Sequence, residues 1–233
     1  MRYWVINNQR LKICIGERGC VYLGVVSYVM GHNLLIILTT VVLMSCHTKD
    51  KTQIDKFQVL LPDTSKTHRP NIIFDNLKLW GNQMGLPQID TGVNDIEVRL
   101  WTSSRFIPDL LVIIREDDSS IISQKIEYFF SPDGVTHFKK GELLQADTLK
   151  PLIDSLKKID FSKLISQNEI ENFNDNLKDG ITYHLEFSSL TYYKLLTYHC
   201  PEHFAPTEQN NKRFLDIILL LDKYLRFYSP KCS

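Results

Sequence analysis

The sequence predicts an α+β domain in which an antiparallel sheet of about five strands, arranged as a meander plus a hairpin, carries two or three helices packed on one face. Residues 95–130 and 181–199 alternate apolar and polar side chains with the period of two that half-buried strands show. Residues 147–159 and 211–228 instead place apolar side chains at helical spacing. Strands and helices therefore occur in groups along the chain, which favours the α+β class.

The first predicted strands form an antiparallel meander. In residues 95–102, three apolar side chains alternate with polar or aromatic ones, as in a strand with one buried face. Residues 109–115 are a continuous apolar run that fits a central strand, and residues 121–130 return with alternation after a polar turn. A Pro-Asp-Gly turn at residues 132–134 ends the meander.

Two helices are predicted next. Asp147 or Thr148 can cap the first, which has Pro151 in its first turn. The apolar stripe of this helix consists of Leu149, Leu152, Ile153, Leu156 and Ile159. The second helix is short, begins with the capping-box pair Ser166 and Glu169, and ends at the next glycine.

A β-hairpin and a last helix complete the predicted domain. Residues 181–187 and 191–199 are rich in aromatic and β-branched side chains, as paired strands are. The hairpin tyrosines are expected to pack across the strands; they are Tyr183, Tyr192, Tyr193 and Tyr198. The helix at residues 211–228 is the best candidate to cover the sheet, and its run 218–221 is so apolar that more than one stripe should be buried.

The first 45 residues are predicted to be a signal peptide. Residues 34–44 carry no charge and would span about 16 Å as a helix, roughly half of the hydrocarbon core of a bilayer. This length suits the apolar region of a signal peptide rather than a membrane span. The polar residues 47–53 follow, as at the start of a mature chain.

The end of this apolar run, Leu43-Met44-Ser45-Cys46, resembles the lipobox of bacterial lipoproteins. The resemblance implies that Cys46 becomes the first residue, with diacylglycerol on its thiol and usually a further acyl chain on its amine. Two or more chains hold a protein stably on a membrane, where one chain is marginal. A lipobox, a tether and a small α+β domain together look like the uncharacterised lipoproteins of Gram-negative envelopes. That likeness implies anchoring in the cell envelope, facing the periplasm or the exterior, and brings no activity with it.

The residues before the apolar run allow three interpretations. The signal peptide begins at Met1, or translation starts at Met30 and residues 1–29 belong to an over-extended reading frame. We favour the second, because a signal peptide of about 15 to 30 residues is usual. In the third interpretation, residues 21–30 join the later run in one uncleaved anchor helix.

Cleavage before Cys46 takes 45 residues from the 233-residue chain and leaves 188, enough for one domain with a real core. We expect residues 46–70 to be a lipidated tether, in which residues 57–61 alternatively pair as an edge strand, and residues 71–233 to be a single domain. Cleavage removes four basic residues and one acidic residue, so the net charge falls from zero to −3. Because no basic stripe is present either, a nucleic-acid partner is not expected.

The cysteines of the predicted domain are Cys200 and Cys232, and an even number in an exported protein suggests a disulfide. The alternative is two unpaired thiols. A weaker candidate is a metal site of His199, Cys200 and His203, with His184 on the neighbouring strand, but no second pair with ligand spacing follows. Cys200 as a nucleophile with an adjacent histidine as base lacks a third, orienting group.

A binding patch is a further candidate. Glu97, Arg99 and Trp101 share one face of a predicted strand, and His184 and Glu186 share a face of another. If these faces adjoin in an uncovered part of the sheet, they form a polar patch with an aromatic platform for a sugar or a peptide. The alternative is the solvated side of a half-buried sheet.

The sequence contains no Gly-rich phosphate loop, nucleophile elbow, His-Glu-x-x-His motif or calcium-binding loop. We therefore expect a membrane-anchored envelope lipoprotein whose domain binds an envelope protein or a glycan, without catalysis and without a cofactor. The alternative is a membrane-tethered hydrolase or metal-dependent enzyme with an unfamiliar site.

Overall fold

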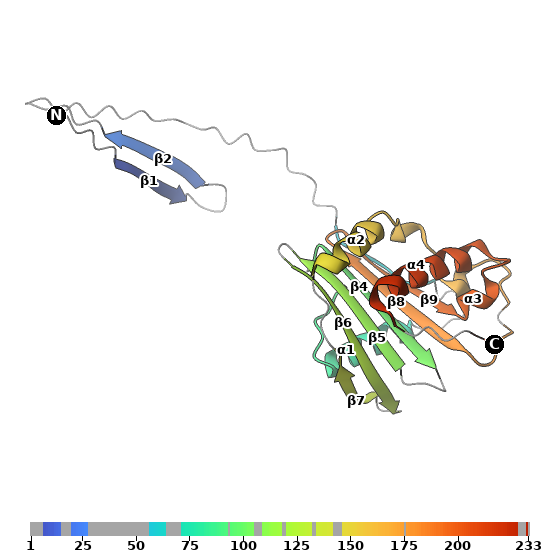
Figure 1. Ribbon diagram of the computed structural model, residues 1–233. Coiled ribbons are helices and arrows are strands. Elements are labelled where there is room, and N and C mark those ends of the chain that lie inside the picture. Colours follow the sequence, from blue (N-terminus) through green and yellow to red (C-terminus); the bar gives the residue numbers. More distant parts are fainter. Residues whose placement is uncertain are drawn as a thin grey trace, which may run out of the picture. The chain divides into compact units, whose positions relative to one another are not determined.

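The structure is a computed structural model of the chain, and it describes residues 7–14, 20–27, 56–63, 71–92, 94–104, 109–117, 120–131, 134–141, 146–174, 176–227 and 232. The chain divides into two compact units, Met1–Ile54 and Asp55–Ser233 (Figure 1). The second unit begins before residue 71, so part of the segment expected to be a tether belongs to the folded domain.

The first unit contains one antiparallel hairpin, formed by β1 (Asn7–Cys14) and β2 (Cys20–Ser27). A strand at this position differs from the interpretation in which residues 21–30 begin an anchor helix. The apolar run 34–44 and Cys46 lie outside the described residues, so the signal peptide and the lipid anchor remain predictions. Among the described residues, no helix has the length and apolarity needed to cross a bilayer.

The second unit is built on a seven-stranded sheet in the order β3-β9-β8-β4-β5-β6-β7. The strands are β3 (Gln58–Leu60), β4 (Ile96–Ser104), β5 (Asp109–Asp117), β6 (Ser120–Ser131), β7 (Gly134–Lys140), β8 (Ile181–Ser189) and β9 (Tyr192–His199). All neighbours are antiparallel except β3, which runs parallel to β9. The α+β class, the meander and the hairpin are confirmed. β3 confirms the alternative in which residues 57–61 pair as an edge strand, and β7 extends the predicted sheet at its other edge.

Helices cover both faces of the sheet, whereas the sequence analysis placed them on one. The helices are α1 (Ile72–Gln83), α2 (Ala146–Leu156), α3 (Pro201–Phe204) and α4 (Gln209–Leu225). Helices α2 and α4 pack on one face, and α1 packs on the other (Figure 1). The second layer exists because the sheet carries a second set of large apolar side chains, among them Trp101, Leu111 and Tyr193, which must also leave water.

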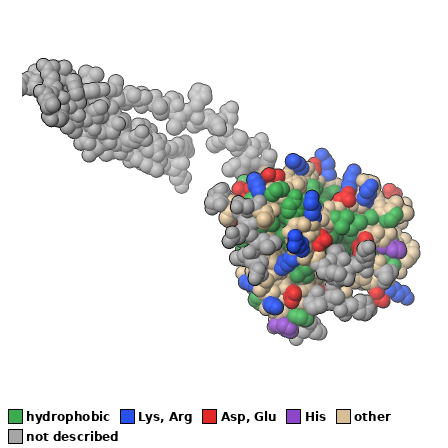
Figure 2. All heavy atoms as spheres, in the orientation of Figure 1, with side chains coloured by type: hydrophobic (Ala, Val, Ile, Leu, Met, Phe, Trp, Pro, Cys, Tyr) green, Lys and Arg blue, Asp and Glu red, His purple; other side chains and the backbone are tan. Residues whose placement is uncertain are grey.

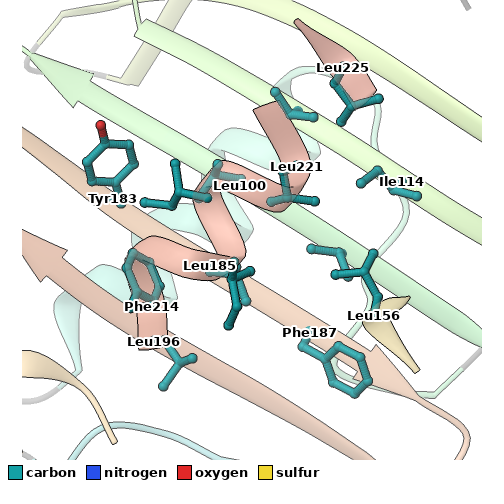
Figure 3. Packing of buried hydrophobic residues seen from close by; sticks show 14 of the residues in the cluster. Leu100, Ile114, Leu156, Tyr183, Leu185, Phe187, Leu196, Phe214, Leu221 and Leu225 are labelled. Atoms are coloured by element: carbon teal, nitrogen blue, oxygen red, sulfur yellow. The ribbon is translucent and has the colours of Figure 1, made fainter. Parts of the chain in front are cut away.

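The larger core lies between the sheet and helices α2 and α4. Alternate residues of the central strands meet across the sheet, so that Leu100 lies opposite both Leu185 and Val112. In Figure 3, side chains of α4 point onto this surface; the labelled ones are Phe214, Leu221 and Leu225. Tyr183 lies opposite Tyr198, as expected for the hairpin tyrosines, and the ring of Tyr198 stacks on Phe214 at 4.0 Å.

The predicted second helix after Ser166 is wrong. Ser166 and Glu169 do form a capping box, but only a 3-10 turn, Gln167–Glu169, follows. The side chain of Gln167 instead bonds to the backbone of β9: its Nε2 donates to His199 O at 2.9 Å and its Oε1 accepts from His199 N at 2.8 Å. These hydrogen bonds hold the turn against the strand, and the positive φ of 55° at Asn172 is incompatible with a right-handed helix, so the helix does not continue.

Cys200 and Cys232 form a disulfide, as predicted, which ties the end of the chain to the sheet. It closes a loop with a sequence separation of 32, which in the chain-entropy treatment is worth roughly 3 to 4 kcal/mol. The bridge requires a glycine beside it, because a Cβ at Gly180 would overlap Cys200 Sγ.

Candidate functional site

A group of buried polar side chains lies between the sheet and α1. We call Glu97, Arg99, Trp101, Glu186 and Tyr193 the polar cluster. They come from the adjacent strands β4, β8 and β9 and occupy the same face, because successive side chains of a strand point to opposite faces. None of the five is more than 4% exposed. The cluster therefore has to satisfy its hydrogen bonds within the protein.

Arg99 is held by one carboxylate and one backbone carbonyl. Its Nε donates to Glu97 Oε1 at 2.7 Å, and its Nη2 lies 2.7 Å from the same oxygen in an ion pair and donates to Pro87 O at 2.6 Å. The other oxygen of Glu97 accepts a hydrogen bond from Asn94 Nδ2 at 2.5 Å. A buried ion pair of this kind is tolerated because further hydrogen bonds occupy the remaining polar atoms.

Glu186 accepts one hydrogen bond on each carboxylate oxygen. Trp101 Nε1 donates to Oε2 at 2.6 Å, and the Tyr193 hydroxyl donates to Oε1 at 2.8 Å. Burial raises the pKa of Glu186, while the positive charge of Arg99 and the two donors act in the opposite direction. The cluster contains two carboxylates and one guanidinium, so it carries a net charge of −1 if both carboxylates are ionised.

Helix α1 and the segment after it close the cluster from solvent. Asn71 caps α1 by accepting from Phe74 N at 3.3 Å, and Lys78 pairs with Asp90 at 2.9 Å beyond the helix. Ser188 Oγ donates to Ile89 O at 2.5 Å and fastens the segment to the sheet. The recess left beneath the helix has a volume of about 10 Å³, which is room for one water molecule.

The structure therefore corrects the predicted binding patch. It brings Glu97, Arg99 and Trp101 together with Glu186, as the sequence analysis expected if their strand faces adjoin. It also covers them, because α1 spans that face of the sheet, so they cannot present a platform to a sugar or a peptide.

His184 lies on the same face of β8, and it is also buried. Its Nδ1 is 3.1 Å from Thr197 Oγ1. Burial lowers the pKa of His184 to about 4, so the ring is neutral at pH 7. His184 does not line the recess, where the nearest ionisable groups are Arg99, Glu186, Lys78 and Asp90.

The metal site of His199, Cys200 and His203 loses its sulfur ligand. Cys200 is bonded to Cys232, and only a thiolate binds zinc or acts as a nucleophile. His203 packs against the ring of Phe204 at 4.9 Å. Within the described residues, no three or more His, Cys, Asp or Glu side chains are grouped so as to hold a metal ion.

One surface feature was missed by the sequence analysis: a groove beside α4. It has a volume of about 440 Å³ and runs between α4 and the 3-10 turn Phe161–Lys163. Its apolar lining consists of Ile159, Leu164, Ile217 and Leu220, and its charged rim of Asp160, Lys163, Arg213 and Asp216.

The sequence feature that could have predicted this surface is the presence of leucines on α4 outside its core stripe. The apolar run 218–221 predicts that more than one stripe of the helix is buried; Ile218 and Leu221 are buried, but Leu219 is 53% exposed and Leu220 is half-buried. An apolar side chain at a helix position outside the core stripe indicates a surface with another use.

Comparison with known proteins gives no relative: no family model, no curated protein and no solved structure matches the chain.

Proposed function

We propose that this chain is an exported lipoprotein, anchored in the cell envelope by lipid on Cys46, whose folded domain is a binding module and not an enzyme. The disulfide between Cys200 and Cys232 is the observation that supports it best. Disulfides persist in the periplasm and outside the cell, whereas the cytosol keeps thiols reduced. A disulfide in the domain is therefore consistent with a chain that is exported by a signal peptide ending in a lipobox.

The polar side chains that would serve catalysis are used within the fold. The carboxylates of the polar cluster accept hydrogen bonds from Arg99, Trp101 and Tyr193, and the recess above them admits one water molecule at most. The groove beside α4 is larger and mostly apolar, which suits contact with another molecule rather than bond cleavage. A protein or a glycan of the envelope is the partner class that this surface serves.

Metabolic labelling with a palmitate analogue tests the anchor. We expect the wild type to be labelled and Cys46→Ala to be unlabelled, because the thiol of Cys46 is the acceptor. Cys20→Ala is the matched control, since this cysteine is absent from the mature chain whether translation starts at Met1 or at Met30. Mass analysis of the mature chain should find an acylated cysteine at its start.

An unmodified N-terminus at Met1 or Met30 would overturn the proposal, as would an unlabelled wild type. Metal analysis of the purified protein tests the catalytic alternative, in which the domain is a metal-dependent enzyme. Stoichiometric zinc would favour that alternative over a binding module.

A further inference from the structure

Lys194 on β9 is a charged side chain that is buried without a partner among the described residues. Only 7% of it is exposed, and no described side chain or carbonyl forms a hydrogen bond or an ion pair with its Nζ. Most lysines and arginines instead lie at the surface, as Figure 2 shows for one face of the molecule. We propose that Lys194 is a nucleophilic amine that binds small aldehydes covalently, as an imine.

The absence of a partner distinguishes Lys194 from the other buried ionisable side chains of the described residues. Each of those forms a hydrogen bond or an ion pair; they are Glu97, Arg99, Asp109, His184 and Glu186. Buried polar groups are nearly always satisfied, so an exception calls for an explanation other than stability of the fold.

The sheet surrounds the stem of Lys194 with apolar side chains. Its register places Leu60 of β3 on one side and Phe187 of β8 on the other. Leu196 follows on the same face of β9, since side chains of a strand alternate between faces. Phe187 in turn stacks on Phe161 at 4.2 Å. The four-carbon stem is therefore packed, which holds the amine in place.

Glu169 is the acid whose charge acts on Lys194, but its carboxylate is used by the backbone. Its Oε1 accepts from Asp63 N at 3.0 Å, and its Oε2 accepts from Ser166 N at 2.6 Å. Among the described residues, no ion pair joins Glu169 and Lys194. The ammonium form of Lys194 is therefore stabilised only from a distance.

The surroundings of Lys194 favour the neutral amine. Burial lowers the pKa of Lys194, and the charge of Glu169 offsets only part of this effect. Beside the other 3-10 turn, Asp160 and Lys163 pair with each other at 2.8 Å. Tyr192, on β9 itself, stays neutral at pH 7 because burial raises its pKa. A lysine desolvated in this way acts as a nucleophile, whereas a protonated lysine has no lone pair to donate.

The tip of the side chain is accessible to a small molecule. Among the described residues, the fully buried side-chain atoms without a hydrogen bond are Asp90 Oδ1, Arg115 Nε and Glu116 Oε2, and Lys194 Nζ is not one of them. Its lone pair adds to the carbonyl carbon of an aldehyde, and both amine hydrogens leave with the carbonyl oxygen as water. A C=N bond remains. Because water reverses this reaction, it amounts to binding, in keeping with a domain that is not an enzyme.

Reductive alkylation of the full-length protein tests the inference. Propanal is added with cyanoborohydride, which reduces each imine to a stable secondary amine, and mass spectrometry gives the rate at each lysine. At pH 7 we expect Lys194 to react at least about threefold faster than Lys212 because more of it is free amine. Lys212 is the matched comparison, since it is exposed and forms no ion pair within the described part of the chain. The ratio should shrink towards about pH 10, where exposed lysines also become free amines.

Two variants identify the amine. With one equivalent of propanal, the wild type and Lys212→Arg should both carry an adduct on Lys194. Lys194→Arg should lose this first adduct, because a guanidinium stays protonated. Circular dichroism checks that the variants fold. If Lys194→Arg does not fold, the rates at the individual lysines of the wild type still decide.

Two results would overturn the inference. One is a rate at Lys194 that does not exceed the rate at Lys212. The other is a ratio of the two rates that stays constant with pH, because access and not a free amine would then set the rate. The inference depends on the folded domain and not on the lipid anchor, so a chain without lipid on Cys46 would contradict the proposed function alone.

Discussion

Glu97 and Glu186 are both buried beside Arg99, yet among the described residues only Glu97 forms an ion pair with it. Glu186 is oriented by two neutral donors, the Trp101 indole and the Tyr193 hydroxyl. The two carboxylates therefore stabilise the fold by different means. One neutralises a buried charge, and the other satisfies two buried hydrogen-bond donors.

Replacing each carboxylate by its amide should separate these roles. Glu97→Gln leaves Arg99 buried without its partner and is expected to lower the free energy of unfolding by about 3 kcal/mol. Glu186→Gln removes one acceptor but no direct ion pair, so we expect a loss of about 1 kcal/mol. Urea unfolding followed by tryptophan fluorescence measures both. Glu127→Gln, at an exposed position, should change stability by less than about 0.5 kcal/mol, and equal losses at the two buried sites would refute this account.

The polar cluster could not be predicted as buried from the sequence. The alternation of Glu97, Arg99 and Trp101 with apolar residues correctly predicts that they share one face of the strand. The same residue pattern occurs whether the ion pair is buried or exposed to solvent, so it does not predict burial. Helix α1 covers this face of the sheet, and the apolar residues of its sequence show no regular periodicity that would predict the contact. In that helix only Leu77 and Gly81 are buried.

At the scale of elements, the sequence predicts those strands and helices whose conformation is determined by residues close to them in the chain. The meander β4–β6, the hairpin β8–β9 and α4 all carry their own periodicity and were predicted. The edge strand β3 was predicted only as an alternative to a tether. It has three residues, and its partner β9 lies more than 130 positions further along the chain, so its place depends on tertiary pairing. The 3-10 turn at residues 167–169 was predicted as a helix for the same reason, since contacts with β9 decide its conformation.

Two leucines of α4 that lie two positions apart, Leu219 and Leu221, should differ sharply in their effect on stability. Leu221 is fully buried in the larger core, and Leu221→Ala is expected to cost 2 to 5 kcal/mol, about what buried leucines usually cost. Leu219 is 53% exposed, so Leu219→Ala should cost less than about 0.5 kcal/mol. Thermal and urea unfolding of the two variants measures this difference. Similar losses would mean that Leu219 contributes to the core despite its exposure.

At the scale of the whole molecule, two buried groups make stability depend on pH in opposite senses. Asp109 accepts from Ser104 N at 3.0 Å, and burial raises its pKa to about 6. Its folded form therefore holds a proton that the unfolded chain has lost, and stability declines as pH rises from about 4 to 6. Burial lowers the pKa of His184 to about 4, so here the unfolded chain takes up the proton first. That contribution is present above about pH 6.5 and is lost as pH falls towards 4.

Variants that remove one group should reveal how much that group contributes to the pH dependence of stability. Asp109→Asn keeps an oxygen for Ser104 N but cannot ionise, so its stability relative to the wild type should increase by about 2 kcal/mol between pH 4 and pH 6. His184→Gln cannot become charged, so its stability relative to the wild type should change the other way and increase by about 2 to 3 kcal/mol as pH falls from 6.5 to 4. Urea unfolding at intervals of pH gives both differences, and taking each against the wild type cancels other titrating groups such as Glu186, whose raised pKa acts in the sense of Asp109. If the free energy of unfolding of either variant changed with pH as that of the wild type does, the replaced group would have the same pKa in the folded and the unfolded chain. Its burial would then carry no electrostatic cost.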